Sequence, residues 1–161
     1  SKDALLLAIA HDVRERLRAT QTAAVESLTA PLDQLYVGTV VSVRFVHEHW
    51  NLFRVLQTEV ADAHGDLLGE SSRIHALDTV AIVEAGQADG SIRADEEPLV
   101  LAHGNQGIVN HMVLAAVRGH LTDVESAAHA AARLAVHAAA ASPEVARAAI
   151  DRCATARPRP T

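Results

Sequence analysis

Apolar residues recur every three or four positions along most of the chain, which is the spacing that gathers them on one side of an α-helix. Leu6, Ile9 and Val13 form the first such series. Only five prolines and eight glycines interrupt the 161 residues, so there is room for long helices. The pattern predicts a first helix that begins at residue 2 and ends between residues 20 and 28. It predicts further helices over residues 29–48, 50–63, 67–87, 95–118, 122–141 and 143–153.

Three of these helices begin with recognisable signals. Pro31 falls in the first turn of the second helix, where the missing N–H of proline costs nothing. Thr122 and Glu125 have the spacing of a capping box, in which the threonine oxygen accepts a bond from the third amide and the glutamate reaches back. Ser142 precedes Pro143 and is expected to cap the last helix.

The composition also favours a helical fold. Apolar residues make up 49% of the chain, yet its aromatic residues are one tryptophan, one tyrosine and two phenylalanines. Alanine, leucine and valine must therefore fill the interior, and such side chains suit closely packed helices better than a β-sandwich. The length is enough for one domain with a buried core. We expect an all-α domain over residues 1–153 and a flexible tail at 154–161.

The charge balance argues against nucleic-acid binding by this chain itself. The formal net charge is −6, whereas a DNA-binding domain usually has a basic face. Arg14, Arg16 and Arg18 alternate with acidic residues and are interpreted as a solvated helix face. No apolar stretch approaches the roughly 20 residues that span a bilayer, and no signal peptide opens the chain. A cytoplasmic location without membrane association is the expectation.

The sequence offers little for catalysis or metal binding. The spacings of its ten histidines mostly differ from the i, i+4 pairs that helical metal sites use, Glu125 and His129 being a single such pair, and no Glu-x-x-His motif occurs. The single cysteine, Cys153, has no identifiable base nearby in the sequence. No Gly-x-Ser-x-Gly or phosphate-binding loop occurs. We therefore expect no enzymatic activity, no catalytic residue, no metal and no cofactor.

Three segments resemble parts of one family. Residues 1–6 (SKDALL) are similar to the junction at which the helix-turn-helix head of TetR-type regulators passes into the regulatory body. Residues 48–56 (EHWNLFRVL) resemble the family's His-Pro-x-Leu-Phe corner, with Trp50 where proline is usual. Residues 84–95 (EAGQADGSIRAD) are similar to its turn into the penultimate long helix. The three occur in the family's order, and the resemblance covers nearly the whole chain.

The resemblance implies a TetR-type C-terminal regulatory helical bundle that dimerises through its last two long helices. It implies a ligand-responsive transcriptional regulator, expected to be a repressor, in which a small, largely apolar effector inside the bundle changes the separation of two DNA-binding heads. The first helix would join the pocket to the head. Operator DNA would be bound only through a head of roughly 45–50 residues that is absent here, and a truncated chain is the expectation.

The homodimer is expected to close by isologous contact of two helices from each subunit. Small residues on these helices would let the subunits approach closely, although the same alanines have the alternative of packing inside their own subunit. The expected interface residues are Gly104, Gly107, His111, Ala115, Arg118, Ala127, Ala128, Ala131, Leu134, Ala135 and Ala138.

A ligand pocket is expected beside residues 95–118, because the middle of this segment is polar for a helix that we expect to be largely buried. Buried amides and imidazoles need partners, which a ligand or ordered water would supply. Apolar residues of earlier helices would complete the wall. The predicted ligand-binding residues are Tyr36, Val40, Phe53, Leu56, Thr79, Ile82, Val83, His103, Gln106 and Asn110.

Two other interpretations stay open from the sequence. The chain is a stand-alone helical module for protein interaction that never binds DNA, or it is a histidine-based metal or haem sensor. A basic helix-turn-helix encoded upstream of Ser1 would favour the regulator, and a start codon at or near Ser1 would favour the interaction module.

Overall fold

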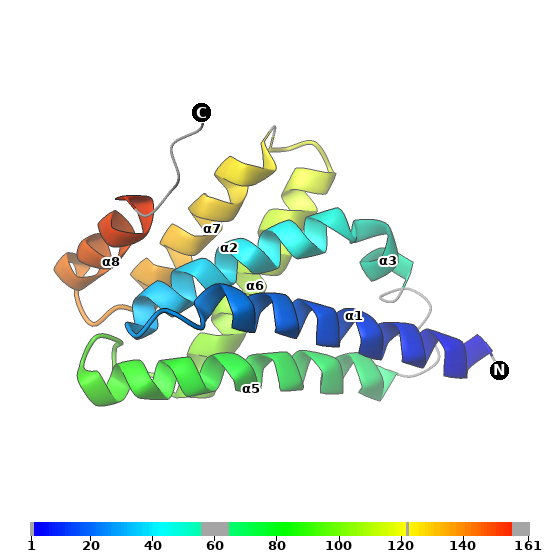
Figure 1. Ribbon diagram of the computed structural model, residues 1–161, viewed down its shortest axis with the longest axis horizontal. Coiled ribbons are helices and arrows are strands. Elements are labelled where there is room, and N and C mark those ends of the chain that lie inside the picture. Colours follow the sequence, from blue (N-terminus) through cyan, green and yellow to red (C-terminus); the bar gives the residue numbers. More distant parts are fainter. Residues whose placement is uncertain (1, 56–64, 122, 156–161) are drawn as a thin grey trace.

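The computed structural model describes residues 2–55, 65–121 and 123–155, and it is helical throughout these ranges apart from connecting turns and a single β-bridge. This confirms the all-α prediction for the described part of the chain. Figure 1 shows the arrangement of the helices. They are α1 (Lys2–Val25), α2 (Pro31–Glu48), α3 (Trp50–Val55), α5 (Gly65–Asp89), α6 (Pro98–Val117), α7 (Val124–Ala139) and α8 (Pro143–Thr155).

Helix α2 is the centre of the bundle. It packs against α1, α5, α6, α7 and α8, and Figure 1 shows α1 and α5 to one side of it and α7 and α8 to the other. Its buried positions follow the helical period and include Leu32, Tyr36, Val43 and Val46. A helix in contact with neighbours on several sides needs a wide apolar surface, and α2 has one.

The core is built mostly from small side chains. Ala128, Ala131 and Ala132 of α7 are fully buried, together with Val43 and Val113 from the facing helices. Because alanine adds only one carbon beyond the backbone, α7 lies close to α2 and α6. A second apolar cluster lies under α1 and contains Val13, Leu17 and Phe45.

The turn between α5 and α6 is tied to the end of α7. Gly90 has φ of +79°, a conformation that a side chain disfavours. Ile92 then pairs with Ala140 in a short β-bridge, where the Arg93 amide donates to Ala139 O over 2.8 Å and the Ala141 amide donates to Ser91 O over 2.9 Å. Residues 84–95, which contain this turn, are therefore held against the end of α7 by backbone hydrogen bonds.

Most predicted helix bounds agree with the structure to within a few residues. Helix α5 begins at Gly65, so residues 65–66 belong to a helix and not to the predicted break. The predicted helix 50–63 is described only as far as Val55.

The start of α7 also differs from the prediction. Its cap is Asp123, whose carboxylate accepts bonds from the amides of Glu125 and Ser126 at 3.0 Å each. Thr122, the predicted cap, lies outside the described residues. Glu125 pairs with Arg44 of α2 and does not reach back to close a capping box. Aspartate competes well for a cap because its carboxylate accepts two amides at once.

In the part of the chain that the structure covers, none of the helices combines the length and the apolar character that crossing a membrane requires.

Candidate functional site

A pocket of about 350 Å³ lies between α1, α2, α5 and α6, and we call it the four-helix pocket. Its size is at the lower end of the range for small-molecule sites. The C-terminal half of α1 forms one wall. The lining residues are Arg18, Gln21, Thr22, Val25, Glu26, Gln34, Leu35, Gly38, Thr39, Asp78, Thr79, Ile82 and Asn105.

Two of these residues join α2 to α6 at the pocket. The Thr39 hydroxyl lies 2.7 Å from Leu35 O and 3.0 Å from Asn105 Oδ1. A hydroxyl has one hydrogen, so it donates to one of these oxygens at a time. Thr39 contacts the oxygen of the Asn105 amide, which leaves the two hydrogens of its nitrogen for other partners. Asn105 therefore keeps donor capacity for a molecule in the pocket.

Two glutamines add acceptors. Gln21 donates its amide nitrogen to Ser42 Oγ over 2.7 Å, and Gln34 donates to Leu28 O over 2.6 Å. Each of these bonds uses the nitrogen and fixes the side chain, which leaves the amide oxygen as an acceptor. The lining thus combines oriented amide groups with the apolar side chains of Leu35 and Ile82.

An ion pair closes part of the pocket wall. Arg18 of α1 lies 3.2 Å from the carboxylate of Asp78 on α5. Their side chains are 54% and 38% exposed, so the pair is screened by solvent and contributes at most about 1 kcal/mol. Its structural effect is to connect α1 to α5 across the pocket.

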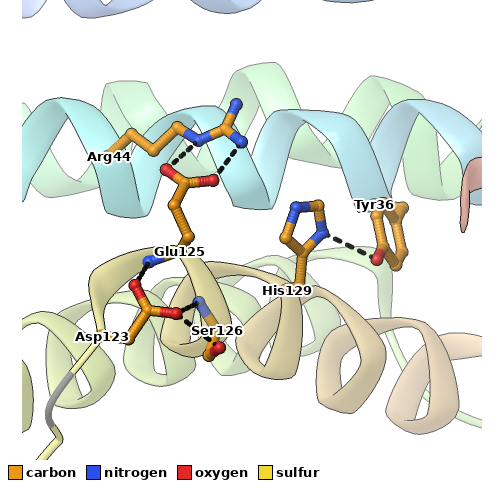
Figure 2. Close-up of polar contacts among 6 residues, drawn as sticks. All are labelled: Tyr36, Arg44, Asp123, Glu125, Ser126 and His129. Carbon is orange, nitrogen blue, oxygen red and sulfur yellow. Dashed lines mark hydrogen bonds and ion pairs between the residues drawn. The ribbon is translucent and has the colours of Figure 1, made fainter. Parts of the chain in front are cut away.

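A second hollow is a more open groove of about 650 Å³ between α2, α7 and the end of α8, and we call it the α2/α7 groove. Figure 2 shows its polar contacts. The Tyr36 hydroxyl lies 2.9 Å from Nδ1 of His129. Tyr36 itself is 3% exposed, so this bond satisfies a hydroxyl at the edge of the core.

The same groove contains a two-pronged ion pair. Arg44 donates to the two carboxylate oxygens of Glu125 over 2.8 and 2.5 Å, as Figure 2 shows. The arginine lowers the pKa of Glu125, chiefly through these hydrogen bonds. With both charges satisfied by each other, the pair joins α2 to α7 and leaves little net charge to attract a ligand.

Comparison with known protein families, with curated proteins and with solved structures finds no match to this chain. The resemblance to TetR-type regulators therefore stays a prediction.

The predicted ligand-binding residues are divided between several places. Thr79 and Ile82 line the four-helix pocket, whereas Tyr36 and Val40 line the α2/α7 groove. Val83 is buried in the main core. The sequence predicted that these residues form the wall of a single pocket. The structure divides them between two hollows because α2 has one hollow on each of two sides.

The remaining predicted ligand-binding residues lie elsewhere. Phe53 packs edge-to-face against Phe45, with ring centroids 6.4 Å apart. Leu56 lies outside the described residues. His103 and Asn110 lie on the exposed side of α6, away from both hollows.

Gln106 is half-buried and lines neither hollow. Its Oε1 is buried without a hydrogen-bond partner among the described residues. The polar residue of α6 that lines the four-helix pocket is Asn105, which the list of predicted ligand-binding residues lacks. Only the rotation of α6 against α2 and α5 distinguishes these neighbouring amides.

The predicted dimer residues also separate into two groups. On α7, the buried members contribute to the core of their own subunit, which is the alternative that the sequence left open. They are Ala127, Ala128, Ala131 and Ala135. Leu134 is 54% exposed and Ala138 is also exposed. On α6, Gly104, Gly107 and His111 are exposed and Ala115 is half-buried, and Arg118, which follows the helix as its C-cap, is exposed.

Helix α6 is less buried than expected. Only Ala102, Val109 and Val113 are fully buried on it, and one side is open along its length. Leu99, Val100 and Val117 are 42%, 53% and 36% exposed on that side. We call this surface, together with Leu134 of α7, the α6/α7 face. It carries four of the six exposed large apolar side chains among the described residues.

The described histidines, cysteine and carboxylates form no group of three or more that is arranged to hold a metal ion. Cys153 lies at the groove end of α8, and its burial raises the pKa of the thiol to about 11, with the Asp33 charge adding to the effect. A thiol with such a pKa is a poor nucleophile at neutral pH.

Proposed function

We propose that this chain is the effector-binding and dimerising regulatory domain of a TetR-type, ligand-responsive transcriptional regulator. The observation that carries the proposal is the four-helix pocket, a hollow of about 350 Å³ whose lining combines amide side chains with the apolar Leu35 and Ile82. Operator DNA would be bound through a separate head, which is in keeping with the net charge of −6.

The position of α1 supports a regulatory role for the pocket. The C-terminal half of this helix supplies Arg18, Gln21, Thr22 and Val25 to the pocket wall. Its other end extends to the far side of the molecule, where the N-terminus lies in Figure 1. The helix has 24 residues and spans about 36 Å at 1.5 Å per residue. A tilt of α1 at the pocket therefore becomes a larger displacement at its N-terminal end.

For such a tilt to follow ligand binding, the ligand must bind one position of α1 more tightly than the other. A difference of about 1–3 kcal/mol is typical of coupled sites. The contacts that would have to adjust are those that hold α1. Its outer part packs through the small cluster of Val13, Leu17 and Phe45, and its pocket end is joined to α5 by the screened Arg18–Asp78 pair.

The α6/α7 face supports the homodimer. Its exposed large apolar side chains, Leu99, Val100, Val117 and Leu134, would be covered by a second copy of the chain. Gly104 and Gly107 lie on the same side of α6 and permit close approach of a second helix. Two copies of this face would form the isologous contact expected for a two-fold dimer.

Two measurements test the proposal. Light scattering should give twice the chain mass at micromolar concentration, and a panel of small molecules should contain members that raise the melting temperature, because a ligand of the folded state stabilises it. A monomer that no compound stabilises would contradict the regulator. A monomer that captures a specific protein through the α6/α7 face would favour the interaction module instead.

A further inference from the structure

The four-helix pocket has hydrogen-bonding capacity that the protein does not use. Thr39 contacts the oxygen of Asn105 and leaves its two N–H hydrogens, and Gln21 and Gln34 use their nitrogens and leave their oxygens as acceptors. Bonds to Ser42 and Leu28 fix the two glutamines, so their oxygens are pre-oriented. Residues that carry hydrogen-bond donors and acceptors therefore line the same hollow.

The charges at the pocket do not suit an ionic ligand. Arg18 is the one cation of the lining, and Asp78 already neutralises it at 3.2 Å. Glu26 adds a negative charge at the rim, which repels anions. For a cation, Asp78 is already paired with Arg18, and Glu26 is exposed, so solvent screens its attraction. A neutral molecule is not repelled by any of these charges.

We propose that the four-helix pocket selects a neutral molecule that carries both a hydrogen-bond donor and an acceptor, such as a carboxamide or a lactam, and that Asn105 is the residue that recognises it. This inference rests on the proposed function, since it names the class of effector for the same pocket. From the sequence, a largely apolar effector is expected, whereas the lining of the pocket favours a polar one.

The physical basis is the cost of leaving a polar group unpaired. An apolar ligand of the same shape would displace water from Asn105 and give it no partner, so the site rejects such a ligand. A carboxamide supplies an oxygen for the Asn105 N–H groups and N–H donors for the glutamine oxygens. The apolar remainder of the ligand would lie against Leu35 and Ile82.

The experiment uses four probes of one shape: benzamide, benzoate, benzylammonium and toluene. Ligand-observed NMR titrations with the whole chain should give a dissociation constant for benzamide at least tenfold lower than for the other three. Asn105→Leu should weaken benzamide at least tenfold. Asn110→Leu is the matched control, because it makes the same change on the exposed side of α6, and it should leave benzamide binding unchanged.

A second variant tests the inference if Asn105→Leu fails to fold. Asn105→Asp has nearly the same shape but carries a negative charge, so the preference should move from benzamide to benzylammonium. Toluene or benzoate binding as tightly as benzamide, or benzamide binding unchanged in both Asn105 variants, would overturn the inference.

The failure of this inference is distinct from failure of the proposed function. If other compounds raise the melting temperature while benzamide does not bind, the pocket is a ligand site of another chemical class and the inference is wrong. If no compound of any class stabilises the chain, the proposed function fails with it.

Discussion

Gly86 and Ile92 are in contact so close that no side chain fits between them. A Cβ added at Gly86 would lie 2.5 Å from both Cγ1 and Cδ1 of Ile92. Ile92 is 1% exposed and also forms the β-bridge with Ala140. The glycine thus allows the chain to fold back from α5, so that one isoleucine fixes the α5–α6 turn against the end of α7.

Replacing Gly86 by alanine should therefore destabilise the fold. Forcing a methyl group against a buried side chain costs about 1–3 kcal/mol, which exceeds the gain in helix propensity. Urea denaturation would measure the free energy of unfolding. Gly38→Ala in α2 is the matched control, since nothing lies within 4 Å of its added Cβ, and it should be neutral or stabilising by up to about 1 kcal/mol. Equal losses in the two variants would contradict this account.

The Arg44–Glu125 pair should give a small, pH-dependent contribution to stability. Its side chains are 47% and 52% exposed, so Arg44→Met should cost less than about 1 kcal/mol at pH 7. The pKa of Glu125 is lowered in the folded state, so this contribution is present above its ordinary value and disappears as the pH falls through the folded pKa. Denaturation curves from pH 7 to pH 3 would measure the loss.

The control for this pair is Arg147→Met, which removes an ion pair with Glu144 within a single helix. Arg147→Met should change the free energy of unfolding less than Arg44→Met, because the Arg147–Glu144 pair lies within one helix and does not connect two helices. A difference between Arg44→Met and the wild type that stays constant down to pH 3 would show that lost packing, and not charge, is responsible.

Cys153 should react slowly with thiol reagents. Burial raises the pKa of its thiol from 9.0 to about 11, so the folded protein at pH 8 has roughly a hundredfold less thiolate than an unperturbed cysteine. The rate of alkylation by iodoacetamide should increase by about this factor in guanidinium chloride at the same pH. A folded protein that reacts as fast as the unfolded chain would disprove the burial of this thiol.

Leu134→Glu should weaken self-association if the α6/α7 face is the dimer interface. The leucine is 54% exposed, and a glutamate buried twice across a two-fold axis would lack a partner. Sedimentation equilibrium should show at least a tenfold rise in the dimer dissociation constant. Leu77→Glu makes the same change at a 45% exposed leucine of α5 and should have no effect. An unchanged dimer in the Leu134 variant would exclude this face.

Much of the secondary structure was predictable because its signals are local. The helical spacing of apolar residues predicted α1, α2 and α8 closely, and Ser142 caps α8 with a bond of 3.3 Å from the Val145 amide. The cap of α7 was predicted one residue too early. Adjacent residues Thr122 and Asp123 are both good caps, and the pattern alone does not rank them.

The candidate site was less predictable. The polar and apolar residues of α6 do not segregate to opposite sides of the helix, so its sequence does not indicate which side is buried. Asn105 and Asn110 are therefore not distinguished by the local pattern. The alanines of α7 posed a similar ambiguity, because small residues serve close packing within a subunit and between subunits equally well. Contacts with α2 resolve this for Ala128 and Ala132, which are fully buried.

The sequence by itself determined that this chain forms helices, roughly where each begins and ends, and that its interior consists of small side chains. Those properties depend on residues within a few positions of one another. The tertiary structure alone decided which polar groups meet at the four-helix pocket, that α2 separates it from a second groove, and that one side of α6 stays exposed. These depend on the rotation of each helix about its own axis, which is fixed only by the residues of other helices packed against it.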